Sequence, residues 1–295
     1  MFSLHGGHSG EFCHHATGAL EDLVRAAVAR GMRVFGLTEH QPPATDASRY
    51  PDEVEAGLTA VGIQERFARY AGEVAPALRE RYRDGIALLV GMETEVVPPD
   101  AYAGEVARLR ERHALEYVVG SVHHVRGLGF DMSAAQYAAT RDAVGGFEAL
   151  CLAYFEAQRA LLEAVRPEVV GHFDLVLKYA APGEALSPAA RRAALENLDV
   201  VRAQGALLEI NARGLRARGA PYPLLDLLQE GQRRGIRATL GDDSHAPDQV
   251  GVGLDRCVAL AAEAGYTALH YLVRAADGEL RQVSAPLDEL VRGAT

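Results

Sequence analysis

The sequence predicts an α/β fold that closes into a barrel, and three observations support this prediction. Short apolar runs alternate along the 295 residues with longer segments of helical spacing, an order typical of a mainly parallel sheet. The apolar runs are nearly continuous, as expected of strands that are buried on both faces. None of the runs has the features of an exposed sheet edge, which favours closure of the sheet.

The predicted elements follow one another from the start of the chain. A first strand at residues 1–4 ends at His5, and helical spacing over 20–28 predicts a helix that Gly31 caps. Further strands are predicted at residues 33–40, 86–96, 117–124, 168–176, 206–211 and 237–245. Helices are predicted near residues 53–80, 101–112, 144–165, 188–203 and 222–234, with a short terminal helix within 285–295.

The chain has no long linker, so residues 1–295 are expected to form a single domain. Two proline-containing stretches, 40–57 and 178–188, each follow a predicted strand. They are interpreted as functional loops of one domain rather than as hinges between two. The length and position of residues 41–55 also suit a lid that closes over a substrate.

The composition is that of an ordinary soluble globular protein. Hydrophobic residues make up 48% and charged residues 24%, and the net charge of -10 argues against a nucleic-acid surface. The three cysteines, Cys13, Cys151 and Cys257, form no CxxC motif, which suits a reducing cytoplasm better than a disulfide scaffold. We find no signal-peptide pattern and no apolar stretch near the roughly 20 residues of a membrane span. A cytoplasmic protein that does not contact membranes is expected.

Almost every predicted strand ends in a residue that can bind a metal or transfer a proton. These residues are His5, His8, His15, His40, Glu93, His123, His172, Asp243 and His245. The carboxyl ends of the strands of a parallel α/β barrel open on one face, so these side chains should converge in one cavity. Burying so many imidazoles and carboxylates unpaired would be costly. Only His113 and His270, away from the strand ends, are interpreted as ordinary surface or core histidines.

The number of candidate ligands exceeds what one ion needs. A catalytic zinc takes about three protein ligands, so this set suits about two or three ions of a site that clamps a phosphoryl group around a bridging hydroxide. Neutral imidazole and carboxylate bind Zn, Mn or Fe, and the sequence does not choose between these metals. Too few cysteines are present for an all-thiolate site.

The motifs HGGHS, CHHA, TEH, GMETE, GSVHH, GHFD and GDDSH, in this order, resemble the PHP (polymerase and histidinol phosphatase) superfamily. Within it, LEINARGLR and PYPLLDLL are similar to the histidinol-phosphate phosphatases. The resemblance extends from His5 to about Gly251. It implies a distorted (β/α)7 TIM-like barrel of the PHP type. It also implies a trinuclear metal site that hydrolyses L-histidinol phosphate to L-histidinol and phosphate, in histidine biosynthesis.

The resemblance also implies how the ligands divide among the ions. The first ion would bind His5, His8, Glu93 and Asp243; the second Glu93, His123 and His172; the third His15, His40 and His245. His14 would be a neighbour that binds no ion. One departure concerns the first strand, where the family usually has His-x-His and this chain has His5-Gly6-Gly7-His8. A spacing of three would point the two rings to opposite sides of a regular strand. The glycines could permit a bulge that restores convergence, and a role for His5 outside the ligand shell stays open.

The mechanism expected from such a site is in-line attack on phosphorus by a metal-bridging hydroxide, with Glu93 and Asp243 holding the ions. Arg216 is the first choice for binding phosphate, because a guanidinium holds phosphate in a fork. Arg213 and Lys178 are alternatives, and Asn211 could position the loop or the substrate.

Other roles at the site are less closely defined by the sequence. Asp174 and His124 are both candidates to protonate the leaving alkoxide. Glu95 and Tyr50 are candidates to meet the amine or imidazole of histidinol.

Three alternatives remain open at this level. The chain could be a PHP phosphoesterase that acts on nucleotides, DNA ends or another small phosphate ester, or a barrel that binds metal without catalysis. It could also be an amidohydrolase, although that family commonly bridges its metals with a carboxylated lysine. The only lysine, Lys178, lies beyond the strand end rather than at it. The oligomeric state is not predicted.

Overall fold

Seven parallel strands form the centre of the computed structural model, which describes residues 1–292. Hydrogen bonds join the strands in the order β1-β2-β3-β4-β7-β8-β9, and every neighbouring pair is parallel. The strands are β1 (Phe2–Ser3), β2 (Val34–Leu37), β3 (Ala87–Glu93), β4 (Tyr117–Gly120), β7 (Val169–Val170), β8 (Leu207–Asn211) and β9 (Ala238–Gly241). All seven lie within the predicted segments.

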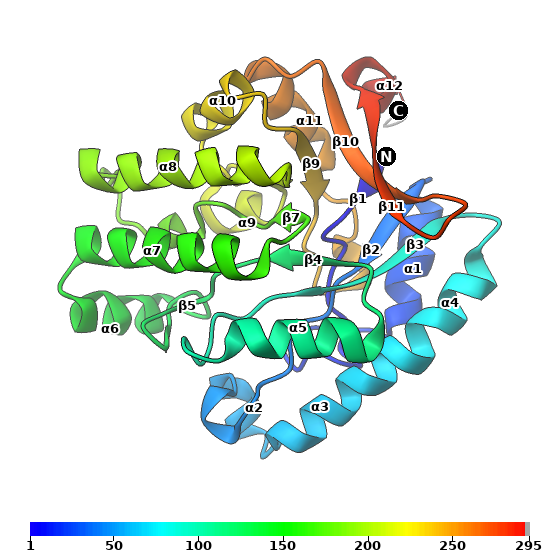
Figure 1. Ribbon diagram of the computed structural model, residues 1–295, viewed down its shortest axis with the longest axis horizontal. Helices are drawn as coiled ribbons and strands as arrows, with labels where there is room; N and C mark the ends of the chain where they lie inside the picture. Colours follow the sequence, from blue (N-terminus) through cyan, green and yellow to red (C-terminus); the bar gives the residue numbers. More distant parts are fainter. Residues whose placement is uncertain (293–295) are drawn as a thin grey trace.

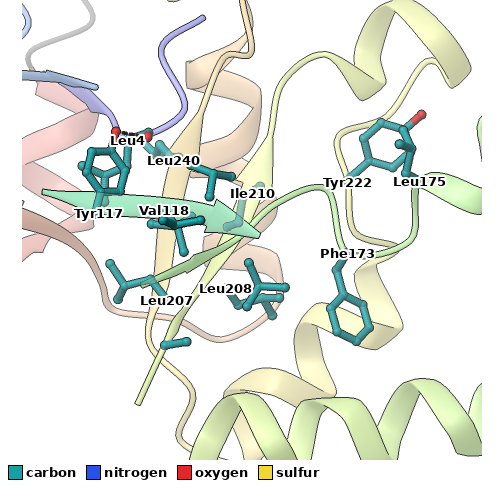
Figure 2. Packing of buried hydrophobic residues seen from close by; sticks show 14 of the residues in the cluster. Leu4, Tyr117, Val118, Phe173, Leu175, Leu207, Leu208, Ile210, Tyr222 and Leu240 are labelled. Carbon is teal, nitrogen blue, oxygen red and sulfur yellow. Dashed lines mark hydrogen bonds between the residues drawn. The ribbon is translucent and has the colours of Figure 1, made fainter. Parts of the chain in front are cut away.

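The sheet closes between its first and last strands. The backbone N–H of Leu4, just beyond β1, donates to the carbonyl of Leu240 on β9 over 2.9 Å. Figure 2 shows these two residues side by side, with Tyr117 of β4 next to Leu4. The Tyr117 hydroxyl crosses the interior and donates to the carbonyl of Leu4 over 2.6 Å. The predicted α/β barrel is therefore confirmed.

Helices cover the outside of the barrel, so its strands are buried on both faces (Figure 1). Leu207 and Leu208 are consecutive on β8 and point to opposite faces, yet both are fully buried. The helices are α1 (Leu20–Ala29), α2 (Pro51–Glu55), α3 (Ala60–Arg69), α4 (Ala75–Tyr82), α5 (Tyr102–His113), α6 (Ala134–Val144), α7 (Phe147–Val165), α8 (Pro188–Gln204), α9 (Gly214–Arg218), α10 (Leu225–Arg233), α11 (Leu254–Glu263) and α12 (Leu287–Arg292).

The segment predicted as one helix near 53–80 is broken in the structure. Gly57 ends α2 with a φ of 67°, which a glycine adopts without steric cost. Further on, α3 and α4 are joined by a wider π turn at Tyr70–Val74. This turn precedes Pro76, which has no N–H to donate to the preceding helical turn. The helix predicted over 20–28 is present as α1, and Gly31 follows it with a φ of 65°.

The end of the chain contains an antiparallel hairpin that the sequence analysis did not predict. It consists of β10 (Ala268–Arg274) and β11 (Leu280–Pro286). The ring of Tyr271 on β10 packs 4.8 Å from that of Phe2 on β1, at the end of β1 opposite the predicted site. The predicted terminal helix begins at Leu287 rather than at 285, and its last residues, 293–295, lie outside the described residues. A second small hairpin pairs β5 (His124–Val125) with β6 (Leu128–Gly129).

Among residues 1–292, none of the helices combines the length and the apolar character that crossing a membrane requires.

Candidate metal centre

The carboxyl ends of the barrel strands bring six of the predicted ligands to one cavity, while His5 and His8 are fully buried and His15 lines neighbouring cavities. Glu93 ends β3, His123 follows β4, His172 follows β7 and Asp243 follows β9. His40 lies beyond β2 and forms a parallel bridge with Glu93. The cavity is lined by His40, Tyr50, Glu93, His123, Asp131, His172, Leu175, Lys178, Arg213, Ala217, Tyr222, Asp243 and His245.

Glu93 is at the centre of the cluster, and its two oxygens face different groups of imidazoles. Its Oε2 atom lies 3.3 Å from Nε2 of His5 and 3.1 Å from Nε2 of His8. Its Oε1 atom lies 2.9 Å from Nε2 of His172 and 3.4 Å from Nε2 of His123. Burial opposes ionisation of Glu93, but the surrounding imidazoles hold its pKa well below the usual range. A carboxylate in this position is arranged to bridge two cations.

Asp243 completes the group on the Oε2 side of Glu93. Its Oδ1 atom lies 3.5 Å from Nε2 of His8 and 3.9 Å from Nε2 of His5. The residue has a φ of 47°, a left-handed conformation that aspartate adopts more readily than most residues. Strain of this kind tends to be retained at functional sites.

A third group lies beside the first two. The Nε2 atoms of His15 and His40 are 3.3 Å apart, and the ring of His245 lies 5.2 Å from that of His15. Burial and the neighbouring His8 lower the pKa of His40 to about 4. Burial and Arg213 likewise hold the pKa of His245 well below its ordinary value. Both imidazoles are therefore neutral near pH 7, which is the form that binds metals.

The cluster contains buried nitrogens that have no hydrogen-bond partner within residues 1–292. They are Nε2 of His5, both ring nitrogens of His8, and Nδ1 of His15, His40 and His172. Each unsatisfied buried group costs on the order of 1–3 kcal/mol. Cations would satisfy Nε2 of His5 and of His8, the two of these nitrogens that face both Glu93 and Asp243, and the donor set of imidazole nitrogens and carboxylate oxygens suits Zn, Mn or Fe. The residues present therefore fit a divalent metal centre.

The two glycines after His5 bring its ring and that of His8 together, but not by the expected bulge. The chain leaves β1 at Ser3, before the histidines, and Gly7 has a φ of 129°. A Cβ atom at Gly6 would lie 2.3 Å from the carbonyl oxygen of Gly36, and one at Gly7 would lie 2.3 Å from that of Ser244. Only glycines fit this turn.

Glu209 hydrogen-bonds to two histidines of the cluster without lining the cavity, and the sequence analysis did not identify it. This fully buried carboxylate on β8 accepts from Nδ1 of His5 over 2.9 Å. Its other oxygen accepts from the backbone N–H of His172 over 2.6 Å and from the amide of Asn211 over 3.0 Å. A carboxylate on the far nitrogen of a ligand histidine fixes its tautomer and orientation. A charged residue inside the apolar run LLEIN was the available signal.

Glu95 lies among histidines and does not stand free in the cavity. Its oxygens are 3.1 Å from Nδ1 of His40, 3.1 Å from Nδ1 of His123 and 3.4 Å from Nδ1 of His124. Tyr50, from the 40–57 loop, donates its hydroxyl to Glu95 over 2.5 Å. Despite its burial, His123 and the other imidazoles hold the pKa of Glu95 well below the usual range. The loop thus contacts the site through Tyr50.

The candidate phosphate-binding cations lie at two depths. Arg213 and Lys178 line both the inner cavity and an outer one, whereas Arg216 is exposed and lines the outer cavity. Nη1 of Arg213 donates to the carbonyl of Asp243 over 3.0 Å. Nζ of Lys178 pairs with Asp131 at 3.3 Å. Asp131 was not identified from the sequence, because it lies in a loop without a recognisable pattern.

Two further candidates occupy supporting positions. Asn211 is buried, and its Oδ1 atom accepts the backbone N–H of Arg213 over 2.9 Å, which orients the loop that carries Arg213. Asp174 is also buried, accepts the backbone N–H of Leu224 over 2.8 Å and pairs with Arg218 at 3.3 Å. It is not among the residues that line the cavity.

The remaining histidines lie outside the cavity. His14 is exposed beside His15, His113 ends α5 and His270 lies on β10. Tyr222, which Figure 2 shows beside Leu175, lines the cavity with its ring 6.4 Å from that of His172, and was also missed from the sequence.

Fold and site together define a parallel α/β barrel with a buried histidine–carboxylate centre suited to divalent cations. The model of the PHP domain matches residues 5–213, and the chain belongs to the PHP domain family. It is 34% identical over 278 residues to an inferred histidinol-phosphatase of Schizosaccharomyces pombe, covering 92% of this chain and 89% of that protein. It is 29% identical over 288 residues to the histidinol-phosphatase of Saccharomyces cerevisiae, covering 85% of each.

Two solved structures share the fold. A proposed histidinol phosphatase of Listeria monocytogenes superposes with a TM-score of 0.75 at 21% identity, covering 86% of this chain and 98% of that chain. The histidinol phosphate phosphatase of Lactococcus lactis, solved with zinc, L-histidinol and phosphate, superposes with a TM-score of 0.66 at 20% identity, covering 91% and 95%.

Proposed function

We propose that this protein is a metal-dependent phosphomonoesterase that hydrolyses L-histidinol phosphate to L-histidinol and phosphate. The observation that carries the proposal is Glu93, whose two oxygens face different groups of imidazoles at the carboxyl ends of the strands: His5, His8 and His40 on Oε2, and His123 and His172 on Oε1. The choice of substrate is supported by two fungal relatives named for this activity, which match most of both chains. The Lactococcus lactis structure, which holds L-histidinol and phosphate, adds support.

The proposed centre holds a trinuclear set of Zn, Mn or Fe ions. His5, His8, Glu93 and Asp243 form the first ligand group, Glu93, His123 and His172 the second, and His15, His40 and His245 the third. When bound, such cations supply an activated water and stabilise charge on the phosphoryl oxygens. The chain itself contributes Glu93 as the shared ligand and Glu209 as the group that orients His5.

Arg213 is the proposed inner cation for the phosphate. Its guanidinium lies beside Asp243 at the cavity wall, where a fork of N–H donors can meet phosphate oxygens. Lys178 lines the same cavity. Arg216, the first choice from the sequence, is placed farther out and is proposed to act at the entrance.

The organic part of the substrate would be held by the acidic and aromatic groups of the cavity. Asp131 lines the cavity, is partly exposed and is paired with Lys178, and its carboxylate suits the ammonium group of histidinol. Tyr50 and Tyr222 offer aromatic faces to the imidazole ring. Of the two sequence candidates for the proton given to the leaving alkoxide, Asp174 is paired with Arg218 outside the cavity lining, whereas His124 lines a neighbouring cavity with His40 and Tyr50. His124 is therefore the proposed donor.

The test is phosphate release from L-histidinol phosphate, measured beside a panel of nucleotides and a generic aryl phosphate. The proposal expects kcat/KM for L-histidinol phosphate to exceed that for every other ester at least tenfold. Equal or greater activity on nucleotides would instead support a PHP phosphoesterase of another substrate class. Failure to hydrolyse any of them in metal-loaded protein would support a barrel that binds metal without catalysis.

A further inference from the structure

Cys13 lies within the third histidine group. One ligand atom from each of Cys13, His15, His40 and His245 can be chosen so that all lie within 4.8 Å of one another. The Cys13 side chain is buried, at 6% exposure. This cysteine has no part in the ligand sets described above.

Two histidines of this group, His15 and His40, point the same ring nitrogen toward each other. Nδ1 of His15 faces Asp52 at 3.5 Å, and Nδ1 of His40 lies 3.1 Å from Oε1 of Glu95 and 3.2 Å from Oε2 of Glu93. Their Nε2 atoms therefore point toward each other and lie 3.3 Å apart. Two nitrogens bound at 2.0–2.1 Å to one tetrahedral ion are about 3.3 Å apart. The Nδ1 atoms of both rings thus face carboxylates, and the space beside the two Nε2 atoms is left for an ion and its other ligands.

The backbone holds Cys13 in this position. Its N–H donates to the carbonyl of Ser9 over 2.8 Å, in a turn that begins next to the ligand His8. The N–H of Thr17 donates to the carbonyl of His245 over 2.8 Å, which ties the end of the segment to the third group. The sulfur is therefore placed by hydrogen bonds at both ends of residues 9–17.

We propose that Cys13 is the fourth protein ligand of the ion held by His15, His40 and His245. This inference rests on the metal centre proposed above. Sulfur binds metals as thiolate, so each ion bound in this way displaces one thiol proton to solvent. Four protein ligands fill a tetrahedral shell, so a phosphoryl oxygen would reach this ion only through expansion to five-coordination. A thiolate also favours Zn²⁺, Co²⁺ or Fe²⁺ over Mn²⁺ at this position.

The test is the absorption spectrum of protein that has been chelated and then loaded with Co²⁺. Bound Co²⁺ gives visible ligand-field bands with any ligand set, whereas a sulfur-to-cobalt charge-transfer band in the near ultraviolet requires a thiolate. Cys13→Ser should lose the charge-transfer band and keep ligand-field bands from the remaining ions. A Cys151→Ala/Cys257→Ala double variant should keep both, because it removes the other two cysteines and leaves Cys13.

Each outcome decides one question. If Cys13→Ser does not fold, the double variant suffices, because a charge-transfer band there can come only from Cys13. Wild-type protein with visible ligand-field bands but no charge-transfer band would overturn the Cys13 inference and leave the metal centre standing. A wild-type spectrum without any cobalt bands would overturn the metal centre and this inference with it.

Discussion

Glu209 has no direct contact with the substrate cavity, yet it fixes two of the residues around Glu93. Three donors converge on its carboxylate, from His5, His172 and Asn211. A glutamine has only one acceptor oxygen, so at least one donor would face an amide N–H₂ group. Glu209→Gln is therefore expected to lower metal affinity and kcat/KM by roughly 10- to 100-fold.

The measurement is metal content after dialysis against a metal buffer, together with kcat/KM. The control is Glu263→Gln, which makes the same chemical change at an exposed position of α11. Unchanged metal retention in Glu209→Gln would show that the carboxylate does not support the site.

Arg213 and Arg216 separate the inner from the outer cation position. Arg213→Ala is expected to lower kcat/KM by about 10- to 100-fold, because a hydrogen bond to a charged group contributes about 1.5–3 kcal/mol. Arg216→Ala should have a smaller effect, because this side chain is exposed and lines the outer cavity. Steady-state kinetics at matched metal content measures both. An Arg216→Ala enzyme with unchanged kcat/KM would rule out a phosphate role for Arg216. A larger loss of kcat/KM in Arg216→Ala than in Arg213→Ala would mean that the phosphate binds in the outer cavity.

Glu39 gives the metal-free protein a pH dependence of stability. Burial raises the pKa of Glu39 from 4.5 to about 7. Between these values the folded protein keeps a proton that the unfolded chain has lost, so the free energy of unfolding falls as pH rises. The shift corresponds to about 3 kcal/mol when complete, and Glu39 is only 2% exposed.

Glu39→Gln cannot ionise and should lack this loss of stability. The variant's stability relative to wild type is therefore expected to rise by about 3 kcal/mol between pH 4.5 and pH 8. Urea unfolding of both chelated proteins across this range provides the measurement. If the free energies of unfolding of the two proteins changed in parallel with pH, the pKa of Glu39 in the folded state would not be raised.

At the scale of elements, the turn between β1 and His8 determines whether the first ligands converge. Gly7→Ala places a Cβ against the carbonyl of Ser244 and strains a φ of 129°, so a loss of about 1–3 kcal/mol in unfolding free energy is expected. The same substitution at Gly104, exposed in α5 with no atom near its Cβ position, should raise stability by up to about 1 kcal/mol. Thermal unfolding compares them. Equal effects would show that the turn tolerates a side chain.

The strands were predictable from the sequence because each apolar run is buried on both faces. The hairpin β10–β11 was not, because its burial does not alternate cleanly and it is only partly covered. Predicting the breaks in the segment near 53–80 required the effects of Gly57 and Pro76 to outweigh the helical spacing around them.

The clustering of histidines and carboxylates at the strand ends was also predictable, since barrel topology brings the ends of distant strands to one face. Glu209, Asp131 and Cys13 were not found, because their places depend on which side chains the closed barrel and its loops bring together. The spacing of His5 and His8 pointed to divergent rings in a strand. The structure shows that the chain has already left the strand there.

At the scale of the whole molecule, barrel closure produces the site. The hydrogen bond between Leu4 and Leu240 joins β1 to β9 and sets His5 beside Asp243, whose backbone N–H donates to the carbonyl of His5 over 2.8 Å. Ligands separated by more than two hundred residues in sequence therefore meet only when the sheet has closed. Metal binding and folding are expected to be coupled for this reason.

The most direct test of the account is a titration of chelated protein with Zn²⁺ or Mn²⁺ while phosphate release from L-histidinol phosphate is recorded. We expect negligible turnover before metal is added, recovery as the metal binds, and no recovery in a Glu93→Gln variant, which lacks the shared carboxylate. Full activity in metal-free protein, or in metal-treated Glu93→Gln, would contradict the assignment of this cluster as the catalytic metal centre.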